Sequence, residues 1–191
     1  MKGRLRPIMV LFFTLVLTIG IPACEGPDYA AIRGIHRLDF LDPATNLLLD
    51  DPVTVVTDSM VLVITPDIEY FSENTFDGTI SEAWAFSPGD PLLANEITDI
   101  RVFADNPIYG VPAGDNIASK LEYGGYREEK LTLNEFLDLL PKKGDDFSYG
   151  LYLYLFFNSR PAIPDEYTFR VELEDNNGYI FRAISSPLTW Q

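Results

Sequence analysis

One hairpin near the C-terminal end of the chain constrains the fold more than any other feature of the sequence. Apolar and polar residues alternate from Tyr167 to Glu174, which is the two-residue period of a strand with one apolar face. The next four residues, Asp-Asn-Asn-Gly at 175–178, supply the positive φ angles of a tight turn, and 179–184 returns as the partner strand. The sequence therefore predicts an antiparallel hairpin over 167–184.

Several further strands are predicted upstream of this hairpin. The segment 147–157 is apolar on both faces, so we expect it to lie centrally in a sheet and to be covered on both sides. Shorter candidate strands, separated by clusters of Pro, Gly, Asp and Asn, span 31–40, 53–57, 60–65, 68–71, 80–86 and 97–104. Many short strands with turn signals between them predict an all-β, antiparallel β-sandwich, with one domain over 30–191.

One short helix is expected within this β-sandwich. Thr132 and Glu135 have the spacing of a capping box. The apolar residues of 133–140 follow at helical spacing, and Pro141 ends the helix. We expect about two turns that close one end or edge of the sandwich.

The N-terminal segment has the composition of an export signal. Lys2, Arg4 and Arg6 precede an apolar run over 8–21. This run has about 14 residues, whereas a helix needs roughly 20 to span a bilayer. The pattern therefore predicts a secretory signal and not a membrane-spanning helix.

The end of that run resembles the lipobox of bacterial lipoproteins. The residues at 21–24 are Ile-Pro-Ala-Cys, in which Pro22 stands where a small residue such as Ala or Ser is usual. The resemblance implies a signal peptide over 1–23 and lipidation of Cys24, with palmitate as an acyl group, so that the membrane is a partner through this anchor. An uncleaved signal anchor and an ordinary signal peptide with an accidental Cys are the alternatives.

The resemblance also predicts where the protein works. Glu25 follows the Cys, in place of the Asp that favours the inner membrane in known lipoproteins, so we expect anchoring in the outer membrane of the cell envelope. Both faces of that membrane, periplasmic and surface, remain open. The tether over 24–29 reaches roughly 20 Å when it is fully extended, which keeps the domain close to the membrane.

The last hairpin carries a second resemblance. The segments 164–171 and 175–178 resemble the final hairpin of bacterial immunoglobulin-like and fibronectin-type domains. In those folds a Tyr at the start of the penultimate strand bonds back to nearby backbone, and Tyr167 takes that position. The whole chain is similar to small bacterial lipoproteins with such a domain, a group without an assigned activity. The resemblance therefore implies an immunoglobulin-like sandwich and no particular reaction.

Charge and composition exclude several classes of protein. The formal net charge is −15, which argues against a nucleic-acid partner because phosphate binding needs a basic face. The single Cys and single His exclude a disulfide framework and a Cys-rich or His-rich metal site. We therefore expect no metal and no cofactor.

The residues that catalysis usually requires are missing from the sequence. His36 is the only His, and there is no Gly-x-Ser-x-Gly motif, so a Ser–His triad is not expected. Asp175 resembles the first ligand of a calcium loop, but the twelfth position is Ser186 where an EF-hand needs Glu. We expect no catalytic residue and no enzyme activity. A glycosidase that uses two of the 29 acidic residues remains open.

Aromatic residues are the remaining indication of binding. Tyr152, Tyr154 and Phe156 share one face of a predicted strand, and Trp84 and Phe86 share a face of another. Such rings stack on sugars when they are exposed, although packing in the core is commoner.

Two functions therefore remain for this chain. One is a non-catalytic binding or structural module with an envelope protein as its partner. The other is a surface glycan binder or a small carboxylate-dependent glycosidase, which a concave site with two facing carboxylates and exposed rings would favour.

Overall fold

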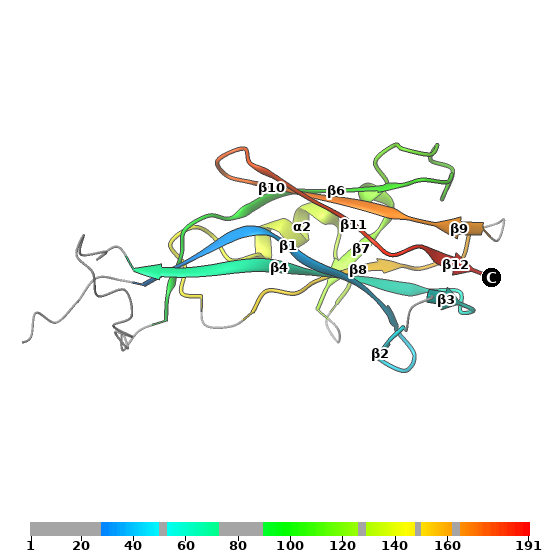
Figure 1. The fold of residues 1–191 in the computed structure, drawn as a ribbon, viewed down its shortest axis with the longest axis horizontal. Coiled ribbons are helices and arrows are strands. Elements are labelled where there is room, and N and C mark those ends of the chain that lie inside the picture. The colour runs from blue at the N-terminus through cyan, green and yellow to red at the C-terminus, as the bar shows by residue number, and fades with distance from the viewer. Residues whose placement is uncertain (1–27, 50–52, 73–89, 126–128, 148–149, 162–164) are drawn as a thin grey trace, which may run out of the picture.

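The computed structural model describes residues 28–49, 53–72, 90–125, 129–147, 150–161 and 165–191. These residues form an all-β sandwich of two packed layers, which confirms the predicted fold class (Figure 1). The predicted signal peptide, Cys24 and the candidate strand over 80–86, with Trp84 and Phe86, lie outside the described residues.

The first layer is a six-stranded sheet. Its hydrogen-bonded order is β2 (Leu47–Leu48), β1 (Asp28–Asp42), β4 (Met60–Ser72), β8 (Leu153–Phe157) and β7 (Glu122–Gly124). β5 (Leu92–Leu93) adds to β1 as a parallel neighbour. β1 begins three residues before and ends two residues after the candidate strand predicted over 31–40. Among the described residues of the apolar segment predicted over 147–157, 153–157 form a strand, which lies between β4 and β7 as the expected central position requires.

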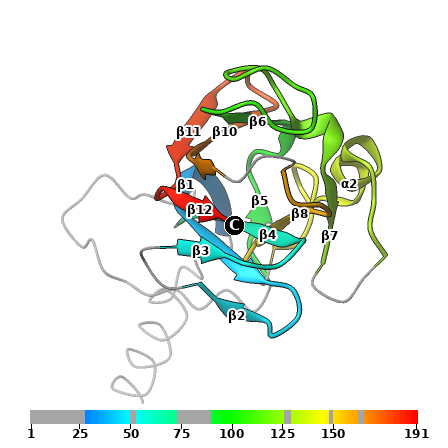
Figure 2. The same ribbon diagram turned by 90° about the vertical axis from the view of Figure 1, so that its right-hand side faces the viewer.

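The second layer consists of two short sheets. One has the order β11 (Ile180–Ile184), β10 (Phe169–Asp175) and β6 (Ile97–Ala104). The other has the order β3 (Val53–Val55), β12 (Leu188–Trp190) and β9 (Asp165–Tyr167). Figure 2 shows the two layers end-on, with β6, β10 and β11 on one side and β4 and β8 on the other. Among the described strand pairs only β1–β5 and β3–β12 are parallel, which the sequence did not predict.

β4 differs from the sequence prediction in its length. The candidate strands over 60–65 and 68–71 form one strand that runs through Pro66. Proline has no N–H and is tolerated where a strand has one hydrogen-bonded neighbour. β8 pairs with β4 only from Met60 to Ile64, so Pro66 lies beyond that ladder and faces Ile35 of β1 alone.

The predicted C-terminal hairpin is confirmed. β10 and β11 pair from Arg170 opposite Ile184 to Glu174 opposite Ile180, and Gly178 in the turn has φ +80°. The apolar residues of β10 point into the core, as their alternation predicted. Glu172, which the alternation placed on the polar face, is nevertheless buried.

Three arginines cover Glu172 on the outer face of this sheet. The Arg182 Nε donates to a Glu172 carboxylate oxygen at 2.9 Å, while Arg101 and Arg170 approach to 3.6 and 3.7 Å. The hydrogen bond from Arg182 is the main cause that lowers the pKa of Glu172, and the positive charges of Arg101 and Arg170 act in the same direction. A carboxylate buried in this way contributes stability in its charged form.

We expect Glu172→Gln to destabilise the fold by roughly 2 kcal/mol at pH 7, because the amide oxygen can still accept from Arg182 but the negative charge that pairs with the three arginines is lost. The pKa of Glu172 is lower in the folded than in the unfolded chain, so its contribution is present above the ordinary value of 4.5 and is lost as the pH falls below it. Urea unfolding at pH 7 and pH 3.5 should therefore show a difference from the parent that shrinks in acid. A difference of the same size at both pH values would contradict this account.

The core between the layers is aromatic. Its largest fully buried side chains are Trp190, Tyr123, Tyr167, Phe157 and Phe169. The ring of Phe157 lies 5.0 Å from that of Phe169 and 6.1 Å from that of Trp190, between centroids. Since β8, β10 and β12 each supply one of these rings, the core ties the layers together.

The predicted helix is also confirmed. Among the described residues α2 (Leu133–Leu139) is the single α-helix, and Thr132 and Glu135 form the capping box at its start. Phe136 is buried and stacks on Tyr123 of β7, at 5.5 Å between ring centroids. α2 therefore covers an edge of the sandwich beside β6 and β7, as its apolar stripe predicted.

Candidate functional site

The outer face of the six-stranded sheet is apolar at its centre. Val61 and Val63 of β4 point away from the main core but are buried. In the register of the sheet, Val61 lies between Leu41 of β1 and Phe156 of β8. We call the group Leu41, Val61, Val63, Tyr154 and Phe156 the outer apolar cluster. A sheet that faces water normally alternates apolar and polar residues, so this second apolar face is unusual.

The three aromatic residues singled out in the sequence lie at this cluster. Tyr154 and Phe156 belong to β8 and point outward, while Leu153, Leu155 and Phe157 point into the core. Phe156 is buried and Tyr154 is partly buried. Tyr152 precedes the strand and is 54% exposed. Burial raises the pKa of Tyr154, and the neighbouring Tyr152 adds to this shift, so the Tyr154 hydroxyl stays protonated at neutral pH.

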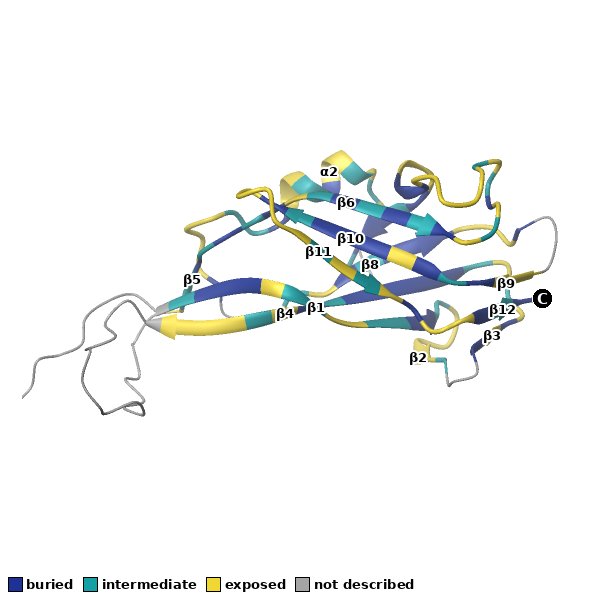
Figure 3. Cartoon of the chain, turned by 45° about the horizontal axis from the view of Figure 1, so that its top comes forward, coloured by how far each residue is buried: buried dark blue, intermediate teal, exposed yellow. Residues whose placement is uncertain are grey.

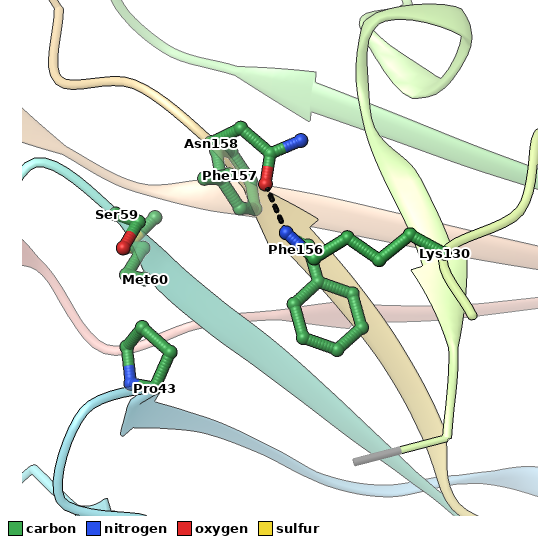
Figure 4. Close-up of a pocket in the computed structure, with 7 residues that line it drawn as sticks. All are labelled: Pro43, Ser59, Met60, Lys130, Phe156, Phe157 and Asn158. Carbon is green, nitrogen blue, oxygen red and sulfur yellow. Dashed lines mark hydrogen bonds between the residues drawn. The ribbon is translucent and has the colours of Figure 1, made fainter. Parts of the chain in front are cut away.

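A hollow of about 280 Å³ adjoins the outer apolar cluster (Figure 4). It is lined by Pro43, Ser59, Met60, Lys130, Phe156, Phe157 and Asn158. The Lys130 ammonium lies 5.0 Å from the centre of the Phe156 ring, donates to Asn158 Oδ1 at 2.7 Å and lies 3.4 Å from a Glu122 carboxylate oxygen. The hollow thus combines an aromatic wall with a fixed cation, which suits a carbonyl or ring group of a ligand.

The sequence did not single out Lys130. It lies in a segment without regular structure that is held against β7 by the bridge between Leu131 and Tyr123. Because Lys130 itself belongs to no strand or helix, no periodic pattern marks its position beside Phe156. Only the packing of β7 against β8 brings the ammonium to this ring.

A second hollow of about 320 Å³ lies where β1 passes β11. Phe71 and Tyr179 line it with exposed rings, and Asp175 supplies a carboxylate. The Asp175 oxygens accept hydrogen bonds from the backbone N–H groups of Asn177 and Tyr179, both at 2.9 Å, and from Asn95 Nδ2 at 2.9 Å. Burial alone would raise the pKa of Asp175, but these hydrogen bonds outweigh it and lower the pKa, so Asp175 is no proton donor at neutral pH.

The remaining residues singled out in the sequence are dispersed over the sandwich. His36 is exposed on β1, away from the outer apolar cluster. Tyr167 is buried as expected. Its hydroxyl donates to the carbonyl oxygen of Pro107 at 3.5 Å, and Pro107 lies 60 residues earlier in the chain and not in the neighbouring backbone. The tyrosine-corner contact expected for Tyr167 is therefore wrong. Burial raises the pKa of Tyr167.

The described residues contain neither a membrane-spanning helix nor a cluster of metal-ligating side chains. No helix there is both long and apolar enough to cross a bilayer. No group of three or more His, Cys, Asp or Glu side chains there could hold a metal ion together.

Comparison with known proteins identifies no family for this chain. No family model matches the chain, and no curated protein matches it. Among solved structures, one named BspA_C_mut is 9% identical and aligns with 87% of this chain at a TM-score of 0.30. The chain corresponds to about half of that structure, 46% of its length, so the likeness carries no argument about function.

Proposed function

We propose that the protein is a lipid-anchored, non-catalytic binding module of the bacterial cell envelope. In this proposal Cys24 carries the acyl chains in the outer membrane, and the outer face of the six-stranded sheet binds an envelope protein. An immunoglobulin-like class is part of the proposal, and the two packed layers with a C-terminal hairpin support it.

The contrast between the two outer faces is the observation that carries the proposal. On the small sheet of β6, β10 and β11, three arginines and three acidic residues pair with one another: Arg101, Arg170, Arg182, Asp99, Glu172 and Glu174. On the six-stranded sheet the equivalent position holds the outer apolar cluster, with exposed Tyr152 at its end. Aromatic residues on an apolar surface with a polar rim are typical of protein interfaces.

The chemistry of the two hollows supports binding over catalysis. The described residues that line the hollow beside Lys130 offer a cation, an amide and a hydroxyl group, and none of these described residues has a carboxylate. In the hollow between β1 and β11, Asp175 is held charged by its hydrogen bonds, which does not suit the proton donor of a glycosidase.

Glycan binding is the second candidate, and one observation favours it. The hollow between β1 and β11 presents the exposed ring of Tyr179 near the side chains of Asn177 and Arg33. An aromatic platform with amide and guanidinium groups beside it suits the ring and hydroxyl groups of a sugar.

Site-specific crosslinking in intact cells tests the proposal. Tyr152 is replaced by the photo-crosslinking residue p-benzoylphenylalanine, and Ile184, which is 70% exposed on the charged outer face, receives the same residue as a matched control. We expect a crosslinked protein of one defined mass from position 152 and none from position 184, because only the first lies at the outer apolar cluster.

Two other results would count against an envelope protein as the partner. Crosslinks of equal yield from positions 152 and 184, or from neither, would show that the outer apolar cluster is no binding surface. The same photo-crosslinking residue at Tyr179, which is 67% exposed in the hollow between β1 and β11, tests the second candidate: a heterogeneous ladder that periodate removes would identify a glycan there.

A further inference from the structure

β1 and β4 extend together beyond β2, β7 and β8, and the short strand β5 pairs with Tyr29 and Ala30 of β1 along this stretch. Their pairing runs to Asp28 opposite Ser72, whereas β8 accompanies β4 only as far as Ile64. The two strands therefore project as a ribbon, at the left of Figures 1 and 3, away from the pole that holds β3 and β12. We call residues 28–33 and 68–72 the ribbon tip.

The ribbon tip carries aromatic rings on both of its faces. Tyr29 and Phe71 are directly opposite in the register and stack at 5.6 Å between ring centroids. Tyr70 follows Phe71 in the alternation and lies on the other face, opposite Ala30. Tyr70 is 57% exposed and Phe71 is 37% exposed. A partner that docks on one side would cover only one of these faces, whereas a medium that surrounds the ribbon tip would cover both.

The ribbon tip carries one basic residue, Arg33, and two acidic residues, Asp28 and Glu69. The Arg33 Nε lies 2.7 Å from a Glu69 carboxylate oxygen, and the guanidinium carbon lies 5.8 Å from the centre of the Phe71 ring. The Arg33 guanidinium thus lies beside an apolar ring while its charge is neutralised by Glu69. A long basic side chain of this kind can keep its charged group at the level of lipid headgroups.

The chain between the ribbon tip and the lipid anchor is short. Three residues separate Cys24 from Asp28, where β1 begins. Four steps of extended chain reach at most roughly 14 Å. If Cys24 is acylated, the ribbon tip lies within that distance of the bilayer surface, which is the layer where Tyr and other amphipathic rings accumulate in membrane proteins.

We propose that the ribbon tip is a second membrane contact, in which Tyr29, Tyr70 and Phe71 enter the interfacial layer of the bilayer that holds the Cys24 lipid. This inference rests on the proposed function, because the anchor brings the tip to the membrane. The acidic chain is repelled by anionic lipid, so the contact is with a zwitterionic surface.

Depth-dependent quenching tests the contact in the full lipidated protein. Cys24 is the only Cys, so in the acylated protein a thiol introduced by Tyr70→Cys is the only one that a polarity-sensitive fluorophore can modify. The protein is reconstituted in phosphatidylcholine vesicles that contain lipids brominated near the headgroup. Asp67→Cys, three residues or about 10 Å further along β4, and Val56→Cys, 70% exposed at the opposite pole, are the controls.

We expect strong quenching and a blue-shifted emission at position 70, weaker quenching at position 67 and none at position 56. Equal emission at the three positions, in protein that floats with the vesicles and has the acylated mass, would overturn the membrane contact and leave the anchor intact. Protein that does not float with the vesicles, or lacks the acyl mass, would overturn the anchor and this inference together.

Discussion

Replacing Trp190 with alanine is expected to cost roughly 3 to 5 kcal/mol of folding free energy, the usual range for truncating a large buried aromatic side chain. Trp190 is fully buried, its indole N–H donates to the Thr57 carbonyl at 2.9 Å, and its ring meets that of Phe157 edge-on. Its strand, β12, joins β3 to β9. Since the free energy of unfolding of a domain is about 5–15 kcal/mol, this substitution removes a large share of the stability of the fold.

Two neighbouring substitutions act as controls for Trp190→Ala. Gln191→Ala should change the free energy of unfolding by less than about 0.5 kcal/mol, because Gln191 is exposed and its contacts with Val55 and Arg160 use backbone atoms. For Trp190→Phe we expect a loss of unfolding free energy between those of Trp190→Ala and Gln191→Ala. This variant keeps an aromatic ring but leaves the Thr57 carbonyl without its hydrogen-bond donor. Urea unfolding followed by circular dichroism measures all three. A Trp190→Ala variant whose free energy of unfolding lies within about 1 kcal/mol of the parent's would refute the claim that this ring stabilises the core.

Cys24→Ser is expected to move the protein from the membrane fraction to the soluble fraction. The hydroxyl group of Ser cannot receive the thioether-linked lipid, and each buried acyl CH₂ contributes roughly 0.8 kcal/mol to anchoring. The rings at the ribbon tip are too few to hold the protein alone, so their contact depends on the anchor. Cell fractionation and vesicle flotation, with intact-mass analysis of the N-terminal peptide, measure the effect.

The control for Cys24→Ser is a change at the neighbouring Pro22. Pro22→Ala restores the small residue usual in a lipobox, so acylation and membrane retention should be unchanged or improved. Equal retention of the parent and the Cys24→Ser variant would instead indicate an uncleaved signal anchor, which holds the chain through 8–21 and not through Cys24.

Features that depend on neighbours in the chain were predictable. The strand alternation and Asn-Gly turn of the hairpin, and the capping box before α2, act over a few residues, and both elements form where expected. The length of β4 was not predictable, because Pro66 breaks a strand only where its missing N–H is needed by a neighbour. The parallel pairing of β3 with β12 joins residues more than 130 positions apart, which no local pattern reveals.

The candidate site likewise combines features that the local sequence predicts with features that only the packing of distant segments creates. Alternation placed Tyr154 and Phe156 on one face, but could not tell whether that face met the core or the outside. Lys130 beside Phe156, and the arginines that bury Glu172, come from segments brought together only by packing.

By itself the sequence determined the all-β class, the closing hairpin, the short helix and the position of the single Cys, since these follow from periodicity, turn chemistry and composition. The tertiary structure alone decided which face of each strand is outside, how far the β1–β4 ribbon projects and which charges meet. The physical reason is that burial and ion pairing depend on distances between residues remote in the chain, whereas backbone preference depends on adjacent ones.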